Sequence, residues 1–245
     1  MSDHVNHVVI CGYDDTTLLL LDLVREEVDT DKMRIVVFED VERPSGVPSD
    51  FIWVRGDPTK QSELDKVRLT HARAVIVVGS RAVSPQDADA RTILTAFTIR
   101  AYLEEQAHQI RGRRAPLYML TEILDSENVA HARAAGADEV VETSRIGFSM
   151  LSHAVRFHGT ADTMSRVLLS GSYNAYVGII PDPPKEPIRY GDLLIKMELI
   201  KQGGLVIGLR PPDRTEIFNP PKDELVLPGT HLIYLAERPI LAPPD

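Results

Sequence analysis

The first strand-like run of this sequence ends in a turn that could hold a phosphate group. The apolar run Val8–Cys11 is followed by Gly12, and leucines from Leu18 onward predict a helix. In dinucleotide-binding units such a turn carries three glycines, which make the turn, let backbone approach a pyrophosphate and let the helix pack on the strand. Only Gly12 is kept here, because Asp14 and Thr17 stand at the other two positions. Asp14 puts a carboxylate where phosphate charge would lie, so the residues favour a retained scaffold over dinucleotide binding.

Three further acidic residues follow predicted strands. Glu39 ends the apolar run 34–38, where an acidic residue holds the ribose in dinucleotide folds, and a strand-end carboxylate facing solvent is an equal alternative. Asp57 follows the third predicted strand, and either Asp57 or Thr59 could cap the next helix. Glu122 lies just past the fifth predicted strand, where open parallel sheets place ligands. The candidate cofactor-binding residues are Gly12, Asp14, Thr17, Glu39 and Asp57.

The elements that must position these residues alternate between strand and helix. This alternation predicts an α/β fold with a Rossmann-like, doubly wound parallel sheet that ends near Thr143. The predicted strands are 8–11, 34–38, 51–54, 74–78, 117–120 and 139–141. The predicted helices are 18 to about 29–31, 60–67, 87–105 and 127–135. The long helix should bury an apolar face made of Ile93, Leu94, Phe97, Ile99, Tyr102 and Leu103.

The pattern changes after Thr143. Two predicted helices, 146–157 and 161–169, follow no further strand, and their apolar faces need a partner, which indicates a helical dimerisation arm. A proline-rich stretch then leads to a small α+β domain. Its predicted elements are a helix at 190–201 and strands at 205–209, 216–218 and 231–235. The expected domains are 1–143, 144–171 and 172–245.

Composition excludes several classes of protein. The net charge of −9 disfavours a nucleic-acid surface, which needs clustered basic residues. The single cysteine, Cys11, rules out an internal disulfide and lies in a predicted buried strand. We find neither an apolar run long enough for a bilayer nor a signal peptide, and expect a cytoplasmic chain.

Catalytic motifs are missing from the sequence. It contains no Gly-x-Ser-x-Gly elbow, no phosphate loop ending in Gly-Lys-Ser/Thr and no His-Glu-x-x-His helix. We therefore expect no enzyme. Two alternatives remain open, an NAD-dependent oxidoreductase and an assembly module that needs no ligand.

Several local signatures stand in an order and spacing that is fairly specific. In the first part they are Val8–Tyr13, Gly56–Thr59, Ala72–Val77 and Ala135–Val140. In the tail they are Gly204–Arg210, Asn219–Pro221 and Pro228–Ile233. The run from Val8 to Val141 resembles the RCK domain, the regulator of potassium conductance. The tail resembles the small C-terminal subdomain that accompanies it, so the resemblance covers nearly the whole chain.

This resemblance implies a function. RCK domains are cytosolic ligand sensors of potassium channels and potassium-uptake systems. They pair through a helical arm that follows the sheet, and the pairs assemble into a ring that pulls on the pore. The resemblance therefore implies a homodimer, which could assemble into an octameric ring, at the inner face of the membrane against a potassium channel or transporter. Ligand binding would favour one of two arrangements of this assembly.

The resemblance also implies a choice of ligand. Uptake-type members keep the glycine-rich turn and bind NAD or adenine nucleotides such as ATP and ADP, which the changed turn disfavours here. The turn looks more like that of calcium-gated archaeal channels. Their calcium site uses a carboxylate after the fifth strand, another two residues later and an aspartate after the fourth strand.

Only part of that calcium set is present. Glu122 matches the first carboxylate, whereas Leu124 and Val78 stand at the other two positions. Asp125 and Glu127 are oxygen donors nearby, and calcium takes six to eight oxygens in flexible geometry. The expected metal ligands for Ca²⁺ are therefore Glu122, Asp125 and Glu127.

Overall fold

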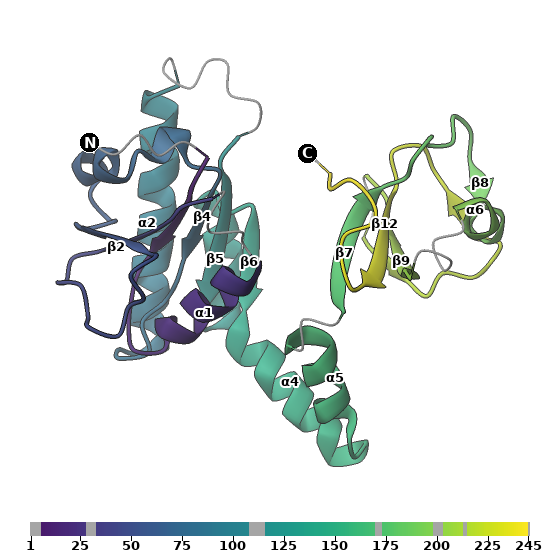
Figure 1. Cartoon of the computed structure of the whole chain (residues 1–245), viewed down its shortest axis with the longest axis horizontal. Helices are drawn as coiled ribbons and strands as arrows, with labels where there is room; N and C mark the ends of the chain where they lie inside the picture. Colours follow the sequence, from purple (N-terminus) through teal and green to yellow (C-terminus); the bar gives the residue numbers. More distant parts are fainter. Residues whose placement is uncertain are drawn as a thin grey trace. The chain divides into compact units, whose positions relative to one another are not determined.

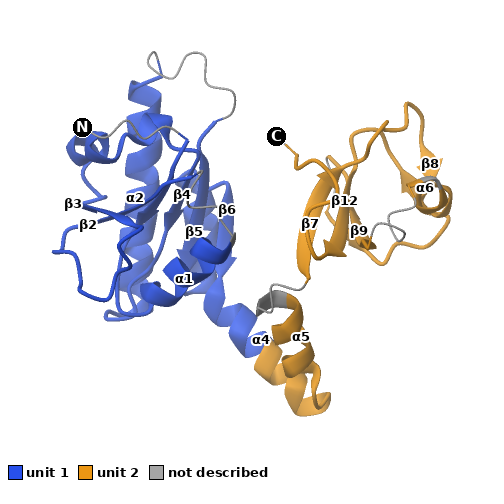
Figure 2. Cartoon of the chain, viewed as in Figure 1, with its two compact units in different colours: residues 1–149 blue, residues 150–245 orange. Residues whose placement is uncertain are grey.

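The computed structural model describes residues 6–27, 33–107, 116–169, 173–197, 203–212 and 215–244. The chain divides into two compact units, residues 1–149 and 150–245 (Figure 2). The predicted end of the first helix, near residues 29–31, lies outside the described residues. The division into three domains at 143 and 171 stays a prediction.

The first unit is built on a six-stranded parallel sheet in the order β3-β2-β1-β4-β5-β6 (Figure 1). This is the strand order of the doubly wound dinucleotide-binding fold, so the predicted fold class is confirmed. The strands are β1 Val8–Cys11, β2 Ile35–Glu39, β3 Ile52–Arg55, β4 Ala74–Val77, β5 Tyr118–Ile123 and β6 Glu139–Glu142. The helices are α1 Thr17–Glu27, α2 Pro85–Glu105 and α3 Val129–Ala134, with 3₁₀ helices η1 Gln61–Val67, η2 Leu69–His71 and η3 Ser126–Asn128.

Both faces of this sheet are covered, which explains the near-continuous apolar strands. Every residue of β1 and β2 is buried. On one face Val9 and Phe38 pack with Ile99 of α2. On the other face Ile10 packs with Leu21 of α1 in a second core. Alternate residues of one strand therefore belong to two different cores, as expected for a parallel sheet between helices.

Helix α2 presents a different face to the sheet than its apolar pattern predicts. Leu94 and Phe97 were expected to be buried but are 51% and 60% exposed. The buried positions are Ala88, Asp89, Thr92, Thr95, Ala96, Thr98, Ile99 and Tyr102. Small side chains let the helix backbone approach the strands closely, and this packing decides the face instead of hydrophobicity alone.

Three predicted elements near the candidate site residues differ from the structure. Strand β5 continues to Ile123, so Glu122 lies within the strand and not past its end. The segment predicted as a helix at 60–67 is the 3₁₀ helix η1, and neither Asp57 nor Thr59 caps it with a side chain. The helix predicted at 127–135 is divided into η3 and α3, which ends before Gly136 at φ +99°.

The second unit begins inside helix α4, because the division of the chain falls after residue 149. Its elements are α4 Thr143–Arg156, α5 Thr160–Leu169, β7 Asn174–Ile179, β8 Ile188–Arg189, α6 Tyr190–Met197, β9 Leu205–Arg210, β10 Ile217–Phe218, β11 Leu225–Val226 and β12 His231–Ala236. Four strands form a sheet in the order β10-β9-β12-β7, and β8 pairs with β11. The sequence did not predict β7, β8 or β11, and the predicted helix end at 198–201 lies outside the described residues.

No helix of the described ranges combines the length and the apolarity needed to cross a bilayer.

Candidate functional site

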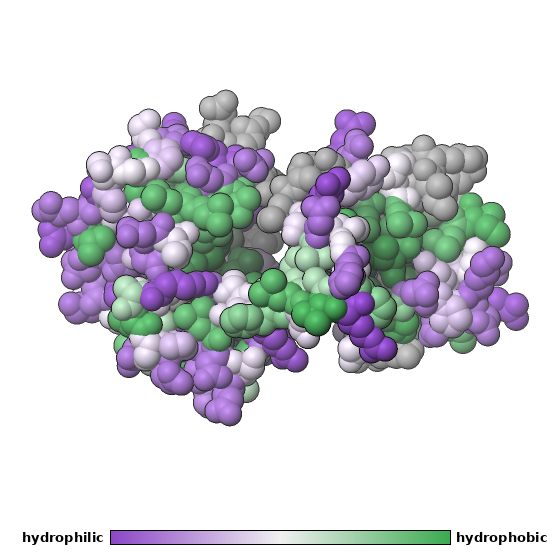
Figure 3. Space-filling view, turned by 90° about the horizontal axis from the view of Figure 1, so that it is seen from below, coloured by the Kyte–Doolittle hydropathy of each residue, from purple (hydrophilic) through white to green (hydrophobic). Residues whose placement is uncertain are grey.

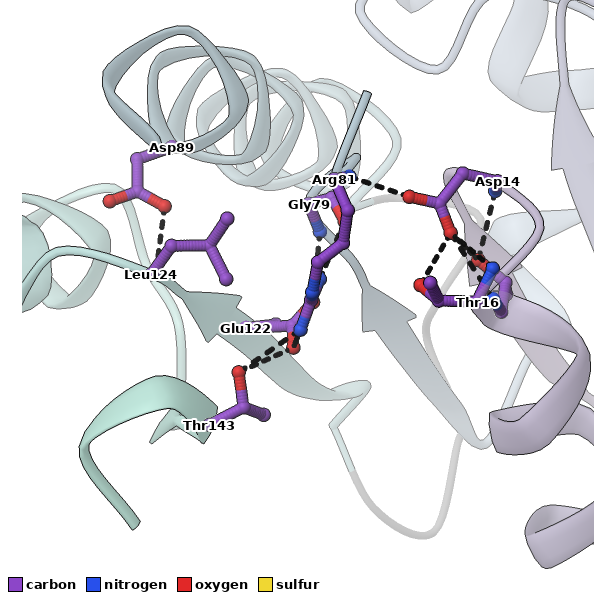
Figure 4. A network of polar contacts seen from close by, with 9 residues as sticks. Asp14, Thr16, Gly79, Arg81, Asp89, Glu122, Leu124 and Thr143 are labelled. Carbon is purple, nitrogen blue, oxygen red and sulfur yellow. Dashed lines mark hydrogen bonds and ion pairs between the residues drawn. The ribbon is translucent and has the colours of Figure 1, made fainter. Parts of the chain in front are cut away.

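Polar side chains from four separate segments meet at the carboxyl end of the central strands. Asp14 follows β1, Arg81 follows β4, Glu122 lies near the end of β5 and Thr143 begins α4 (Figure 4). Strands β1 and β4 are neighbours, and the sheet order reverses direction between them. This is the switch point at which open α/β sheets bind ligands.

Asp14 occupies the hydrogen-bond donors that a phosphate would use. Its Oδ1 accepts from the backbone N–H groups of Thr16 at 2.9 Å and Thr17 at 3.2 Å. The hydroxyls of the same two threonines donate to Oδ1 at 2.6 and 3.2 Å. The N–H groups at the start of a helix are an anion site. Here the anion is a side chain of the turn itself.

These bonds outweigh the effect of burial on Asp14. Burial alone would raise the pKa of this carboxyl, but hydrogen bonds from Thr16, from the Arg81 backbone and from Thr17 lower it below its usual value. The carboxylate is therefore charged near neutral pH. A pyrophosphate would have to displace Asp14 and would meet its negative charge.

Arg81 links this turn to Glu122. Its backbone N–H donates to Oδ2 of Asp14 at 2.5 Å. Its guanidinium donates from Nη1 to Oε2 of Glu122 at 2.9 Å and from Nη2 to Oε1 at 2.5 Å (Figure 4). Paired, parallel bonds of this kind are the stronger form of an arginine–carboxylate contact.

Glu122 is fully engaged by its neighbours. Besides Arg81, the Thr143 hydroxyl donates to Oε1 at 2.7 Å and the Gly79 N–H donates to Oε2 at 3.2 Å. Burial would raise the pKa of Glu122, but the bonds from Arg81 and Thr143 lower it. The bond to Glu122 in turn raises the pKa of Arg81. Sequence reasoning missed Arg81 and Thr143, and the one available signal was an arginine in the loop that follows a central strand.

The three expected metal ligands are not brought together. Asp125 accepts from the Glu127 N–H at 3.1 Å and so caps η3. The buried Asp89 holds this segment by accepting from the N–H groups of Leu124 at 2.8 Å and Asp125 at 3.0 Å. Across the described residues, no group of three His, Cys, Asp or Glu side chains could hold a metal. As they stand, these carboxylates do not fit a calcium ion.

A cavity of about 250 Å³ lies beside this network, between the ends of β1, β2 and β4 and helix α2. Its lining includes Cys11, Gly12, Glu39, Arg91 and Thr92. Glu39 is buried there and accepts from Arg91 Nη2 at 2.5 Å. The solvent-facing alternative for Glu39 is therefore wrong, because this carboxylate is buried, and the candidate ribose ligand is ion-paired with Arg91. Burial raises the pKa of the Cys11 thiol, which fits a structural role.

The other predicted cofactor residues shape turns. Thr17 accepts from the Asp14 N–H at 2.9 Å and donates back to that side chain. Asp57 accepts from the N–H and the hydroxyl of Thr59 at 3.0 and 2.7 Å and pairs with Lys60 at 3.2 Å. Burial would raise the pKa of Asp57, but these bonds lower it. Of the predicted set, Gly12 and Glu39 line the cavity, whereas Asp14, Thr17 and Asp57 stabilise local backbone.

Comparison with known proteins agrees with this architecture. The family model described as the calcium-activated potassium channel slowpoke-like RCK domain matches residues 3–129. The calcium-gated potassium channel TvoK of Thermoplasma volcanium is 24% identical over 166 residues, which cover 66% of this chain and 44% of that protein. The human SLO3 gating ring is similar in fold, with a TM-score of 0.64 at 14% identity over 95% of this chain and 44% of that one.

The chain spans less than half the length of the curated relatives that it matches. The family model, by contrast, covers just over half of the chain, including β1 to β5 with Asp14, Arg81 and Glu122 but without Thr143. The chain therefore belongs to the family of slowpoke-like RCK domains.

Proposed function

We propose that this chain is a regulatory domain that gates a potassium channel from the inner face of the membrane. In this proposal two copies pair through the helical arm, residues 143–169, and the pairs assemble into a ring that acts on the pore. One observation carries it, the hydrogen bond from Thr143 to Glu122. Thr143 is the first residue of α4, so this bond joins the carboxyl end of the central strands, where the polar network lies, directly to the arm.

The arm exposes an apolar surface that pairing would cover. Helices α4 and α5 have no fully buried residue among those whose side chains are described. Their exposed apolar residues are Ile146, Phe148, Leu151, Val155 and Met164, with Phe157 between the helices. Apolar (green) patches are visible on the face of the molecule that Figure 3 presents. Large exposed apolar patches mark interaction surfaces. A second copy of the same arm is a self-complementary partner for them.

A change at the sheet edge would move the start of the arm. Glu122 is held by Arg81 and Gly79 of the β4–α2 loop and by Thr143 at the start of α4. If Glu122 shifts, α4 loses the bond at its first residue. A ligand or partner that binds one of the two arrangements more tightly would change the population of both.

Two alternatives differ in support. The assembly module without a ligand is favoured by the saturation of Asp14 and Glu122 within the chain. The oxidoreductase loses support because Asp14 occupies the N–H groups that would bind the pyrophosphate of NAD. We infer no catalytic role.

The pairing is tested by light scattering on the full chain. Val155→Asp should convert a dimer to a monomer, because it places a charge in the proposed arm interface. Ile195→Asp on α6 is the matched control, since Ile195 is 78% exposed and Val155 is 80% exposed. Equal dissociation by both variants, or by neither, would contradict the arm as the pairing element.

The gating role is tested by rubidium uptake in cells that express the channel with this chain intact or altered. Val155→Asp should change uptake at constant channel abundance, whereas Ile195→Asp should not. Unchanged uptake in a variant shown to be monomeric would refute the gating role. The proposal that the arm is the pairing element would still stand.

A further inference from the structure

The guanidinium of Arg81 lies among oxygen atoms that a hard cation would also accept. Besides the two oxygens of Glu122, Nη1 donates to the Gly79 carbonyl oxygen at 3.0 Å and Nη2 to the Thr143 hydroxyl at 3.2 Å (Figure 4). Two carboxylate oxygens, one carbonyl and one hydroxyl thus converge on a single positive charge. Oxygen ligands in flexible geometry are the chemistry of calcium sites.

We propose that Arg81 is a tethered cation that takes, at the end of β5, the place of a divalent ion. The sheet edge and the first residue of the arm are then held in one arrangement without calcium. This inference rests on the proposed function only for its consequence in gating, since the contacts themselves lie within residues 1–149.

Charge and exposure support this reading. The Glu122 side chain is only 11% exposed, so its negative charge needs a partner that stays in place. Arginine stays protonated at all physiological pH values and presents a fork that matches a carboxylate. The guanidinium is covalently part of the chain, so this cation cannot diffuse away when ionic conditions change. The backbone bond from Arg81 to Asp14 holds the loop that carries it. A calcium ion would have to displace it.

A second ion pair on the same sheet supplies a control. Arg91 and Glu39 also meet at 2.5 Å, and the Glu39 side chain is 7% exposed. Glu39 also accepts from the Asp40 N–H at 2.9 Å, and among the described residues Arg91 donates to Glu39 only. This pair resembles the Arg81 pair in charge, distance and burial, but the Arg91 guanidinium makes no hydrogen bond to a carbonyl or hydroxyl oxygen of the described residues.

The test compares melting temperatures of the chelator-stripped full chain with and without calcium. We expect no shift for the wild type up to about 10 mM calcium, above the usual range of protein dissociation constants. Arg81→Gln should lower the melting temperature by about 5 °C or more, because Glu122 is left buried without its partner. Calcium should recover at least about half of that loss by binding the native state.

Two variants establish where the calcium acts. Arg91→Gln should also lower the melting temperature but gain no calcium response. Arg81→Gln combined with Glu122→Gln should lose the response of the single variant. Calcium stabilisation of the wild type that Glu122→Gln abolishes would overturn the proposal, as would an Arg81→Gln variant that calcium does not stabilise. Light scattering on the same samples measures pairing through the arm independently of calcium. Failure of the calcium prediction can therefore be distinguished from failure of the proposed function.

Discussion

Arg81 and Glu122 form a paired ion contact across 41 residues of sequence, with Nη1–Oε2 at 2.9 Å and Nη2–Oε1 at 2.5 Å. Asp14 makes the complementary arrangement in the β1–α1 turn, where a carboxylate lies on the helix N–H groups. The chain thus supplies a cation at one position of the sheet edge and an anion at the other. Both positions are ones at which the resemblance to RCK domains implies an external ligand.

The bond between Thr143 and Glu122 should contribute measurably to the stability of the first unit. Thr143→Val removes the donor and should lower the free energy of unfolding by about 1.5–3 kcal/mol, as for a hydrogen bond to a charged group. Thr143→Ser keeps the hydroxyl and should change it by less than about 0.5 kcal/mol. Urea unfolding followed by the fluorescence of Trp53, the only tryptophan, reports on this unit. Equal losses in both variants would contradict the role of the bond.

Acid should weaken the turn around Asp14. The folded-state pKa of Asp14 lies below its ordinary value of 3.8, so the unfolded chain binds more protons in this pH range. The stabilisation is complete above 3.8 and is lost as the pH falls through the lowered folded-state pKa. The stability difference between wild type and Asp14→Asn, measured by urea unfolding, should therefore shrink over that interval. A difference that does not depend on pH would rule out this assignment.

Nucleotides should not stabilise the wild-type chain. Thr16 and Thr17 already donate their N–H groups to Asp14, and its charge repels phosphate. The melting temperature should be unchanged by NAD or ATP. Asp14→Asn removes the charge but keeps an acceptor oxygen in the turn, and we expect no shift for this variant either. A rise in the wild type would show that the Asp14 side chain leaves the turn on binding.

Gly12 should be intolerant of any side chain. Its φ is +97°, and an added Cβ would lie 2.5 Å from the Val78 carbonyl oxygen. Gly12→Ala should cost at least about 1–3 kcal/mol, the range for a strained backbone conformation. Gly147 in α4 has no atom within 4 Å of the equivalent position, so Gly147→Ala should stabilise by about 0.5–1 kcal/mol. Trp53 fluorescence during urea unfolding measures both, and equal effects would contradict this distinction.

The two faces of α2 should differ in their tolerance of substitution. Ile99 is fully buried, so Ile99→Ala should cost about 2–5 kcal/mol. Phe97 is mostly exposed, so Phe97→Ser should change stability by no more than about 0.5 kcal/mol. The same unfolding experiment compares them. A larger loss at Phe97 than at Ile99 would mean that the apolar pattern, and not the small side chains, determines the buried face.

The parallel sheet and its switch point could be predicted from the amino-acid sequence alone. Apolar runs such as those of β1 and β2 are local signals, because a strand buried on both faces must be hydrophobic throughout. The role of Gly12 is also a local signal, because a turn with a positive φ requires glycine at that position in the chain. Three strands of the second unit were not predicted. Two of them, β8 and β11, have two residues each and show no periodicity, whereas β7 has six residues.

Only the tertiary structure decided what the charged residues do. Glu122 was found from its place near a strand end, but its partners Arg81 and Thr143 lie 41 and 21 residues away. The face of α2 and the pairing of Glu39 with Arg91 also depend on how closely elements approach. The hydrophobic pattern of a single segment predicts which of its side chains are buried. It does not predict which distant side chain neutralises a charge, because that contact forms only when the strands are paired in the folded sheet.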